Sequence, residues 1–213
     1  MSASLTVAEQ LLPGWLVSLQ AAARRRGEVP IEVVLTATNS DHVLDQVRAA
    51  DADLGFVEGP HTPRGLHSRV VAHDELVLVV RPYHRWVRRG SAITARELTD
   101  TPLVTREPGS GTRHYLTAAL ENLLGAGAGE TAPALELSTS AAVRAAVLAG
   151  SAPAVLSRLA VCDDIAMGRL RVVPVSGLDL RRDLRAVWLG GPTPPAGAVR
   201  DLLGHIGSIT RGR

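Results

Sequence analysis

The sequence of 213 residues has no lysine, a single cysteine and few aromatic residues. Because all 23 basic residues are arginines, Schiff-base chemistry, a lysine nucleophile and a phosphate-loop lysine are excluded. Cys162 alone cannot build a disulfide framework or a zinc site of several thiolates. Aromatic residues make up 3% and the net charge is +2, which argues against base stacking and against nucleic-acid binding by bulk electrostatics.

Long hydrophobic runs are absent as well. Residues 1–10 lack the basic and apolar regions of a secretory signal, and no stretch approaches the ~18 apolar residues of a membrane span. We therefore expect a cytoplasmic protein, or a part of something larger, with no membrane partner. The 46% hydrophobic and 21% charged residues are typical of a globular protein that needs no metal to hold a core. The seven histidines show no metal-ligand spacing, so we expect no metal site and no cofactor.

Strand-like and helix-like patterns alternate along the chain, which predicts an α/β fold of two units. Residues 75–81 (ELVLVVR) are apolar on both faces, as in a central strand of a parallel-type sheet. The other expected strands are 31–36, 54–57, 102–105, 135–137, 154–156, 170–175 and 184–189. Helices are expected over 41–50, after the loop 106–112, after 138–140, from 158 to 167 and over 199–206. Near the start, an apolar helical stripe contains Pro13, so that helix either begins near Pro13 or begins near Thr6 and bends.

Four short polar clusters each follow a strand and precede a helix. Helix N-termini carry unpaired N–H groups and the positive end of the helix dipole, so each cluster is a potential anion site, although plain N-capping explains any one of them. In open α/β sheets, ligands bind beyond the carboxyl ends of the strands, and two facing units would aim all four clusters into one cleft. The clusters are Ser4-Leu5-Thr6, Thr38-Asn39-Ser40, Ser110-Gly111-Thr112-Arg113 and Ser138-Thr139-Ser140, with Asn39 or Ser40 as an N-cap.

The loop Pro108–Arg113 is the most specific of these motifs. Its glycines give the backbone the conformational freedom to surround a ligand, and the guanidinium of Arg113 can donate two parallel hydrogen bonds to an anion. The loop therefore favours a small anionic effector. Glu58 is expected to place a carboxylate on the rim of the cleft, so the sign of the net charge in the cleft is undecided from the sequence. The arginine pairs, Arg181-Arg182 among them, are expected on solvated faces.

No catalytic residue is expected. Cys162 falls in a predicted apolar helix, where cysteine is usually an inert small hydrophobe. The histidine nearest to Ser110 is His114, in the first turn of the following helix, where the dipole disfavours an imidazolium. We therefore expect binding without turnover, and the chain is not expected to be an enzyme.

Five segments in order resemble the effector-binding domain of LysR-type transcriptional regulators, and together they cover nearly the whole chain. They are ASLTVAEQLLPGWL (3–16), TNSDHVLDQVRAADADLGFVEGP (38–60), HDELVLVVRPYHRW (73–86), PLVTREPGSGTR (102–113) and ELSTSAAVRAAVLAGSAPAVLSRLAV (136–161). The resemblance implies a periplasmic-binding-protein-like fold of the second type. Its two α/β subdomains, residues 1–77 plus 186–213 and residues 78–185, would be joined by crossing strands near 76–80 and 186–189.

In that family a small effector sits in the cleft between the subdomains. The residues that the resemblance assigns to effector binding are Ser4, Thr6, Thr38, Asn39, Ser40, Glu58, Ser110, Gly111, Thr112, Arg113, Ser138 and Thr139. It also implies a homodimer or higher homo-oligomer, with helices 13–25 and 115–124 as candidate interfaces because their apolar stripes are broad. Those stripes would equally serve to cover the chain's own sheet.

Three departures from the family pattern matter. The winged helix-turn-helix is absent from this chain, so DNA contact is expected only through a missing N-terminal domain. The first strand is almost entirely missing before Ala3, which is expected to loosen the first sheet and the Ser4 site. Ala152-Pro153 stands where the family has a glycine-containing turn. A transporter's solute-binding protein and, with less support, an enzyme on the same scaffold remain the alternatives, and upstream codons for a helix-turn-helix or a lipoprotein signal would separate the first two readings.

Overall fold

The computed structural model describes residues 1–128 and 131–211, which form two compact units. Unit 1 contains residues 1–73 and 183–213, and unit 2 contains residues 74–182. Two strands, β4 (His67–Val80) and β11 (Arg181–Trp188), pass from one unit into the other. The expected subdomain boundaries lie a few residues further along the same two strands.

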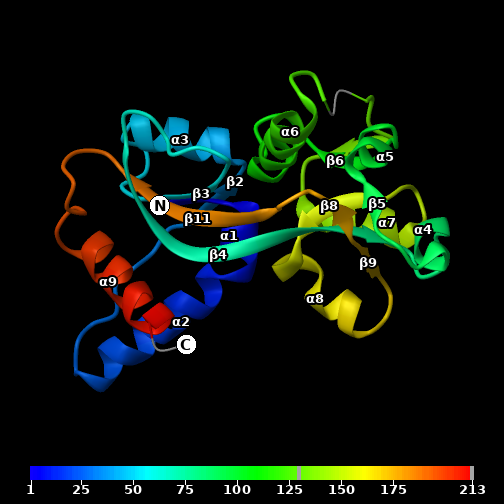
Figure 1. Ribbon diagram of the computed structural model, residues 1–213. Helices are drawn as coiled ribbons and strands as arrows, with labels where there is room; N and C mark the ends of the chain where they lie inside the picture. The colour runs from blue at the N-terminus through cyan, green and yellow to red at the C-terminus, as the bar shows by residue number, and fades with distance from the viewer. Residues whose placement is uncertain (129–130, 212–213) are drawn as a thin grey trace. The chain divides into compact units, whose positions relative to one another are not determined.

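Unit 1 is built on a sheet with the order β2-β1-β3-β11. Strand β1 is parallel to β2 and β3, whereas β11 is antiparallel to β3. Helix α3 covers one face of this sheet, and α2 and α9 lie on the other (Figure 1). The elements are β1 (Ser2–Ser4), α1 (Leu5–Gln10), α2 (Leu12–Arg25), β2 (Thr36–Thr38), α3 (Ser40–Arg48), β3 (Gly55–Glu58) and α9 (Ala198–Arg211).

The strand expected over 31–36 is wrong in position. Residues 31–35 have no regular structure, and β2 covers Thr36–Thr38. The parallel ladder between β1 and β2 has three residue pairs, and it begins where Ser2 pairs with Thr36. The β-branched run before Thr36 therefore has no sheet partner, and Val34 is 75% exposed.

The apolar stripe near the start forms two helices rather than one bent helix. Leu11 separates α1 from α2, and Pro13 lies in the first turn of α2. Proline has no N–H to donate, and the first-turn N–H groups have no helical acceptor, so this is where the helix tolerates it. Leu12, Trp15 and Leu19 are buried, so the stripe covers unit 1's own core.

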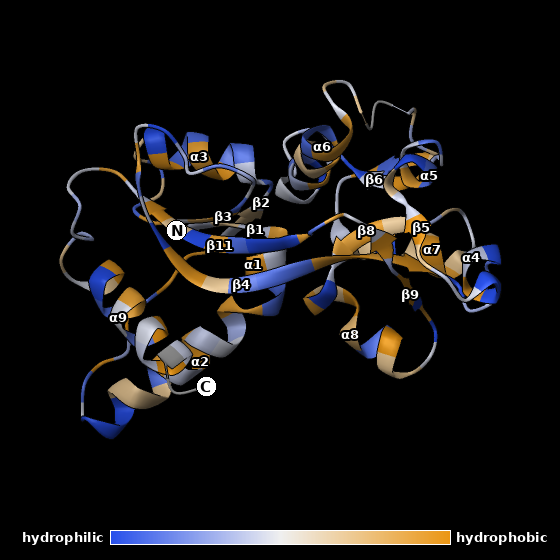
Figure 2. Cartoon of the chain, viewed as in Figure 1, coloured by the Kyte–Doolittle hydropathy of each residue, from blue (hydrophilic) through white to orange (hydrophobic). Residues whose placement is uncertain are grey.

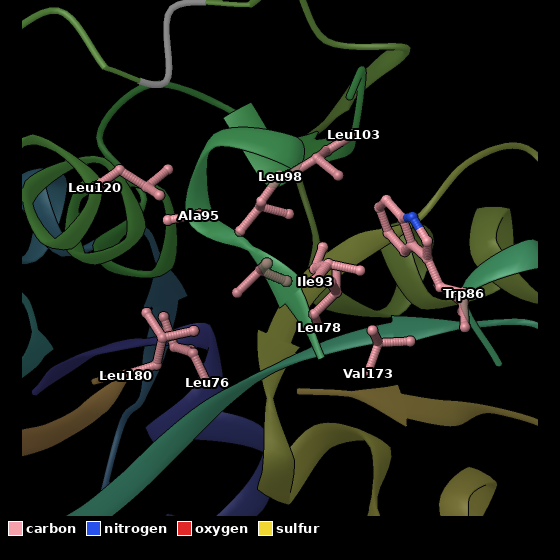
Figure 3. Close-up of a cluster of buried hydrophobic side chains, with 12 residues drawn as sticks. Leu76, Leu78, Trp86, Ile93, Ala95, Leu98, Leu103, Leu120, Val173 and Leu180 are labelled. Atoms are coloured by element: carbon pink, nitrogen blue, oxygen red, sulfur yellow. The ribbon is translucent and has the colours of Figure 1, made fainter. Parts of the chain in front are cut away.

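In unit 2, β4 lies between two antiparallel partners, β8 and β9. Leu76 and Leu78 pack into one hydrophobic cluster (Figure 3). Val77 and Val79 pack into another, so burial on both faces is confirmed. The expectation of a parallel-type sheet is wrong for β4, since burial on two faces does not specify the direction of the neighbours. In Figure 2 the unit 2 half of β4 and β8 carry the hydrophobic colour.

Two smaller parallel pairs complete unit 2. Strand β6 pairs with β7, and β10 pairs with β5. The elements are α4 (Arg85–Arg89), β5 (Ile93–Thr94), α5 (Ala95–Thr99), β6 (Val104–Arg106), α6 (Gly111–Leu124), β7 (Leu135–Leu137), α7 (Ser140–Ala149), β8 (Ala154–Ser157), α8 (Arg158–Ala166), β9 (Arg171–Val173) and β10 (Val175–Ser176). Within residues 1–128 and 131–211, no helix has the length and apolar character to cross a membrane.

Candidate functional site

In unit 1, the expected residues gather at the carboxyl ends of three neighbouring strands. Ser4 ends β1, Thr38 ends β2 and Glu58 ends β3. Asn39 is the N-cap of α3, because its Oδ1 accepts the backbone N–H of His42 at 3.0 Å. The Thr38 hydroxyl lies 3.3 Å from His42 Nδ1.

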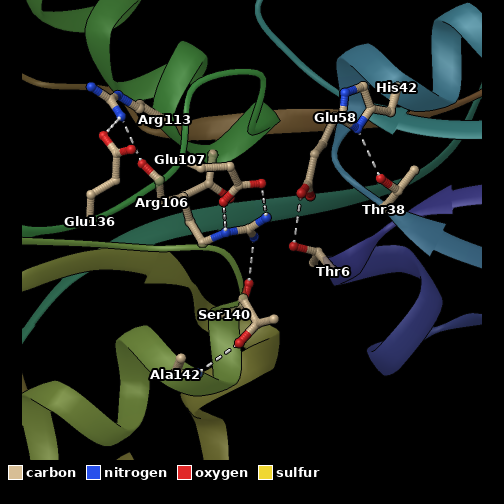
Figure 4. A network of polar contacts seen from close by, with 12 residues as sticks. Thr6, Thr38, His42, Glu58, Arg106, Glu107, Arg113, Glu136, Ser140 and Ala142 are labelled. Atoms are coloured by element: carbon tan, nitrogen blue, oxygen red, sulfur yellow. Dashed lines mark hydrogen bonds and ion pairs between the residues drawn. The ribbon is translucent and has the colours of Figure 1, made fainter.

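Glu58 is buried, not on the rim as expected. It is 2% exposed, and its Oε1 accepts the Thr6 hydroxyl at 3.0 Å (Figure 4). The Ser40 hydroxyl donates to the Glu58 carbonyl at 3.0 Å and lies 3.3 Å from the Glu58 N–H. Thr6, Ser40 and Glu58 therefore form one hydrogen-bonded cluster within unit 1.

Ser4 and Ser110 share an unusual feature. Each occupies an N-cap position with extended backbone, yet neither side chain makes the capping hydrogen bond. Both hydroxyl oxygens are buried and have no hydrogen-bond partner among the residues that the structure describes. A buried hydroxyl without a partner costs about 1–3 kcal/mol, so such an atom at a helix N-terminus points to a ligand group.

Around Ser110, unit 2 presents the first turn of the 14-residue helix α6. Gly111 and Thr112 are buried, and the N–H groups of a first helical turn have no acceptor inside the helix. His114 lies in this first turn, as the sequence predicted, and its side chain is exposed. The arrangement offers several donors to one acceptor group.

Two arginines next to this turn are already paired (Figure 4). Arg106 is buried and binds Glu107 through Nε and Nη2 at 2.7 and 2.8 Å, and its Nη1 donates to the Ser140 hydroxyl at 3.1 Å. Arg113 donates through Nη1 to Glu136 at 2.6 Å and to the Arg106 carbonyl at 3.0 Å. The arginines thus fix the loop geometry, and their charge is balanced by two glutamates.

The last cluster lies at the start of α7. The Thr139 hydroxyl caps α7 by accepting the Ala142 N–H at 3.0 Å, while Ser138 is exposed. Thr139 therefore has an N-cap role in the folded chain, and Ser138 keeps its hydroxyl open to solvent.

The expectation that Arg182 lies on a solvated face is wrong. Its guanidinium is buried and donates to Asp74 Oδ2 through Nε at 2.9 Å and Nη2 at 2.7 Å. Arg182 Nη1 also donates to the Thr112 hydroxyl at 3.2 Å, and Ser157 donates to Asp74 Oδ1 at 3.0 Å. Sequence reasoning missed this network, although Arg182 shares the face of β11 that carries Leu184 and Ala186, and that alternation signals burial.

Thr112 and Arg113 also line a cavity of about 70 Å³ inside unit 2. Its walls come from α5, β6, α6 and the segment around Thr131 and Pro133. The Thr105 hydroxyl, on β6, is buried there without a hydrogen-bond partner among the described residues.

Cys162, which the sequence places as an inert small hydrophobe in an apolar helix, lies in α8 with its side chain exposed. It faces away from the packed side of α8, where Val161 and Asp164 are buried. Within the part of the chain that the structure describes, no group of three or more histidine, cysteine, aspartate or glutamate side chains is placed to hold a metal ion.

Two α/β units joined by two strands, with polar residues at the carboxyl ends of parallel strands, define a periplasmic-binding-protein-like fold of the second type. The chain belongs to the LysR substrate binding domain family, which matches residues 1–208. This family assignment sets aside the alternative of a transporter's solute-binding protein.

A curated relative from Mycobacterium bovis, the uncharacterized HTH-type transcriptional regulator Mb2303c, is 61% identical over 206 residues. The match covers 97% of this chain and 66% of the relative, so the chain spans a little under two thirds of that protein's length. A third of the relative therefore lies outside the matched segment.

Two solved structures show the same fold. The CcmR regulatory domain of Synechocystis PCC6803, in complex with 2-PG, gives a TM-score of 0.81 at 24% identity, covering 99% of this chain and 96% of that one. The effector binding domain of QuiR, in complex with shikimate, gives 0.80 at 10% identity, covering 100% and 96%.

Proposed function

We propose that this chain is the ligand-sensing domain of a LysR-type transcription regulator and that its effector is a small anion. The observation that carries the proposal is the Ser110 hydroxyl, which is buried at the N-terminus of α6 without a hydrogen-bond partner among the described residues. Helix N–H groups and a spare hydroxyl together suit a carboxylate or phosphate oxygen. The two solved neighbours in complex with 2-PG and with shikimate support a small-molecule ligand.

The charge balance around α6 refines the proposal. Because Arg106 pairs with Glu107 and Arg113 pairs with Glu136, hydroxyl and backbone donors supply most of the recognition, with little excess positive charge. Such binding depends on short directed hydrogen bonds, so it is expected to weaken little with added salt.

A thermal-shift titration tests the anionic effector. The probes are inorganic phosphate and short-chain carboxylates, since a ligand that binds the folded state raises the melting temperature by mass action. The shift is expected to fall strongly in Ser110→Ala and to disappear in a Thr112→Val, Arg113→Gln double variant. Ser151→Ala, which removes an exposed hydroxyl elsewhere in unit 2, is the matched control and should keep the wild-type shift.

Unit 1 is tested separately with the same probes. We propose that the Ser4 and Thr38 clusters contribute to binding the effector, so Ser4→Ala and Thr38→Val should weaken the response to the same anion. A response that depends on Ser110 but is unchanged in both unit 1 variants would limit the site to unit 2.

We also propose a homodimer, with DNA contact through a part of the whole regulator that this chain does not contain. The breadth of the two apolar stripes no longer supports the dimer, because Leu12, Trp15, Leu19 and Leu120 cover each unit's own core. What remains exposed is Val17 on α2 and Leu123 on α6, 68% and 45% accessible. Light scattering at micromolar concentration should give twice the chain mass, and a monomer mass would refute the proposal.

The proposed effector is bound without being consumed. The relative from Mycobacterium bovis is named as a transcriptional regulator, and a site that only binds an anion needs hydrogen-bond donors but no general base. Incubation with any stabilising probe, followed by mass spectrometry, should show no change in the probe. Consumption that scales with protein concentration and stops in Ser110→Ala would contradict this.

A further inference from the structure

The cavity beside α6 has a composition that suits a particular kind of ligand arm. Six threonines line it, together with leucines and valines from the core of unit 2. The threonines are Thr99, Thr101, Thr105, Thr112, Thr117 and Thr131. Leu98, Leu103, Leu116 and Leu120 supply apolar walls. The lining is therefore apolar at the walls and rich in hydroxyl groups.

Most of those hydroxyls are already engaged with the protein. Thr99 donates to the Arg96 carbonyl and Thr101 to the Glu97 carbonyl, both at 2.8 Å. Thr131 donates to the Thr99 carbonyl, and Thr112 accepts from Arg182. Thr105 differs from them, because its Oγ1 is buried and has no hydrogen-bond partner among the described residues.

The two charged residues of the lining are also satisfied. Arg106 binds Glu107 and Ser140, and Arg113 binds Glu136 and the Arg106 carbonyl. An ionised ligand group inside the cavity would compete with these pairs and would lose its hydration as well. The cavity therefore suits an uncharged group that hydrogen-bonds to Thr105 and packs its carbons against the leucines.

The size of the cavity limits the length of this group. A volume of about 70 Å³ admits a short arm of a few non-hydrogen atoms. Thr112 and Arg113 belong both to the lining and to the first turn of α6, so the cavity adjoins the proposed anion site.

We infer that this cavity is a specificity subsite for a short hydroxyl-bearing arm of the effector, with Thr105 as the residue that recognises the hydroxyl. The inference rests on the proposed anion site at α6 and names the effector class: a small acid with an uncharged hydroxyalkyl substituent. Thr105 donates to or accepts from that hydroxyl, and the carbons of the arm pack against the leucines of the lining.

Matched pairs of acids test the inference. Propionate, butyrate and pentanoate are compared with 3-hydroxypropionate, 4-hydroxybutyrate and 5-hydroxypentanoate in thermal-shift and calorimetric titrations. For at least one chain length, the wild-type protein should bind the hydroxy acid roughly fivefold more tightly, the factor that one neutral hydrogen bond gives. In Thr105→Val the preference should vanish, while binding of the unsubstituted acids persists.

The same variant gives a readout without ligand. Because the Thr105 hydroxyl has no partner within the described part of the chain, Thr105→Val should raise the melting temperature of the free protein by roughly 2–4 °C. Thr99→Val makes the same chemical change at another threonine of the cavity lining but removes a hydrogen bond to the Arg96 carbonyl. It should therefore lower the melting temperature and keep the preference for the hydroxy acid.

The outcomes separate this inference from the proposed function. If neither these acids nor inorganic phosphate stabilises the wild-type protein, the anion site at α6 is refuted. If the acids bind with the expected dependence on Ser110 but without a hydroxyl preference, or if Thr105→Val keeps that preference, the subsite is refuted and the anion site stands.

Discussion

At the residue scale, Asp164 shows how unit 2 stabilises a buried carboxylate. Its side chain is 1% exposed and accepts hydrogen bonds from Arg144 at 2.9 Å and Arg169 at 2.7 Å. Burial by itself raises the pKa of this carboxyl group, but the hydrogen bonds from Arg169 and Arg144 outweigh it and leave the pKa below its ordinary value. The folded structure therefore stabilises the ionised form of Asp164.

Asp164→Asn is expected to lower the free energy of unfolding at pH 7. Both arginines are partly exposed and can be hydrated when they lose the carboxylate, so the loss is about 1–2 kcal/mol rather than the larger cost of a fully buried pair. Because the folded pKa is depressed, the stabilisation is present above the unfolded value near 3.8 and is lost as the pH falls below it. Urea unfolding at pH 7, 5 and 3.5 measures the difference in the free energy of unfolding between wild type and Asp164→Asn, and this difference should become smaller only at pH 3.5. The control Asp163→Asn, at the exposed neighbouring residue, should unfold with the wild-type free energy at each pH.

Single residues also mark where sequence reasoning ends. The capping roles of Asn39, Thr139 and Ser157 follow from local chemistry, and all three side chains accept a backbone N–H of the first helical turn. The burial of Glu58 and Arg182 depends on partners 52 and 108 residues away in sequence, Thr6 and Asp74. No local pattern contains those pairings, although the alternation along β11 does signal the burial of Arg182.

At the element scale, Gly55 controls how α3 packs on the sheet of unit 1. A Cβ on Gly55 would lie 2.8 Å from side-chain atoms of Val43, Val47 and Val187. The two valines of α3 and the one on β11 thus pack directly over the backbone of β3. Only the absence of a side chain at Gly55 permits this close contact between helix and strand.

Gly55→Ala should lower the free energy of unfolding by about 1–3 kcal/mol through overpacking. Adding Val47→Ala, which makes room for the new methyl group, should cost less than the sum of the two single changes, so a double-mutant cycle gives a clear coupling energy. Gly59→Ala is the control, because a methyl group at that position would have nothing within 4 Å, and its effect should be within about 0.5 kcal/mol. Simple additivity of the pair would argue against the packing account.

The elements themselves were largely predictable. Long periodic helices such as α3, α6 and α7, and the doubly buried half of β4, follow from hydrophobic spacing. The short elements between Arg85 and Thr99 gave no such signal, because helices of five residues do not complete a periodic pattern. The direction of the strands beside β4 was also hidden, since burial alone does not encode it.

At the scale of the whole molecule, each described hydrophobic cluster lies within one unit. One belongs to unit 1 and contains Val43, Val47 and Val57, and two belong to unit 2 on opposite faces of β4. The alternation of strands and helices predicted two such units. That the final helix belongs to the first unit was predicted only by the family resemblance. Unit 2 is bounded by Asp74 and Arg182, the buried ion pair that links β4 to β11.

This boundary pair leads to a prediction about cooperativity. Arg182→Met leaves the Asp74 carboxylate buried without its guanidinium partner, which should cost about 3–5 kcal/mol within unit 2. Because the described cores are separate, the loss should appear in hydrogen exchange as faster exchange of unit 2 amides, including the Leu76 N–H that bonds to the Leu180 carbonyl. Amides of β1 and β3 in unit 1 should keep their protection. The neighbouring Arg181→Met is the matched control. The hydrogen bonds from Arg181 lower the pKa of Asp179 to about 2, but both side chains are exposed and solvent screens the pair, so its loss should leave the exchange rates nearly unchanged. Equal acceleration of exchange in both units by Arg182→Met would show instead that the two units unfold as one.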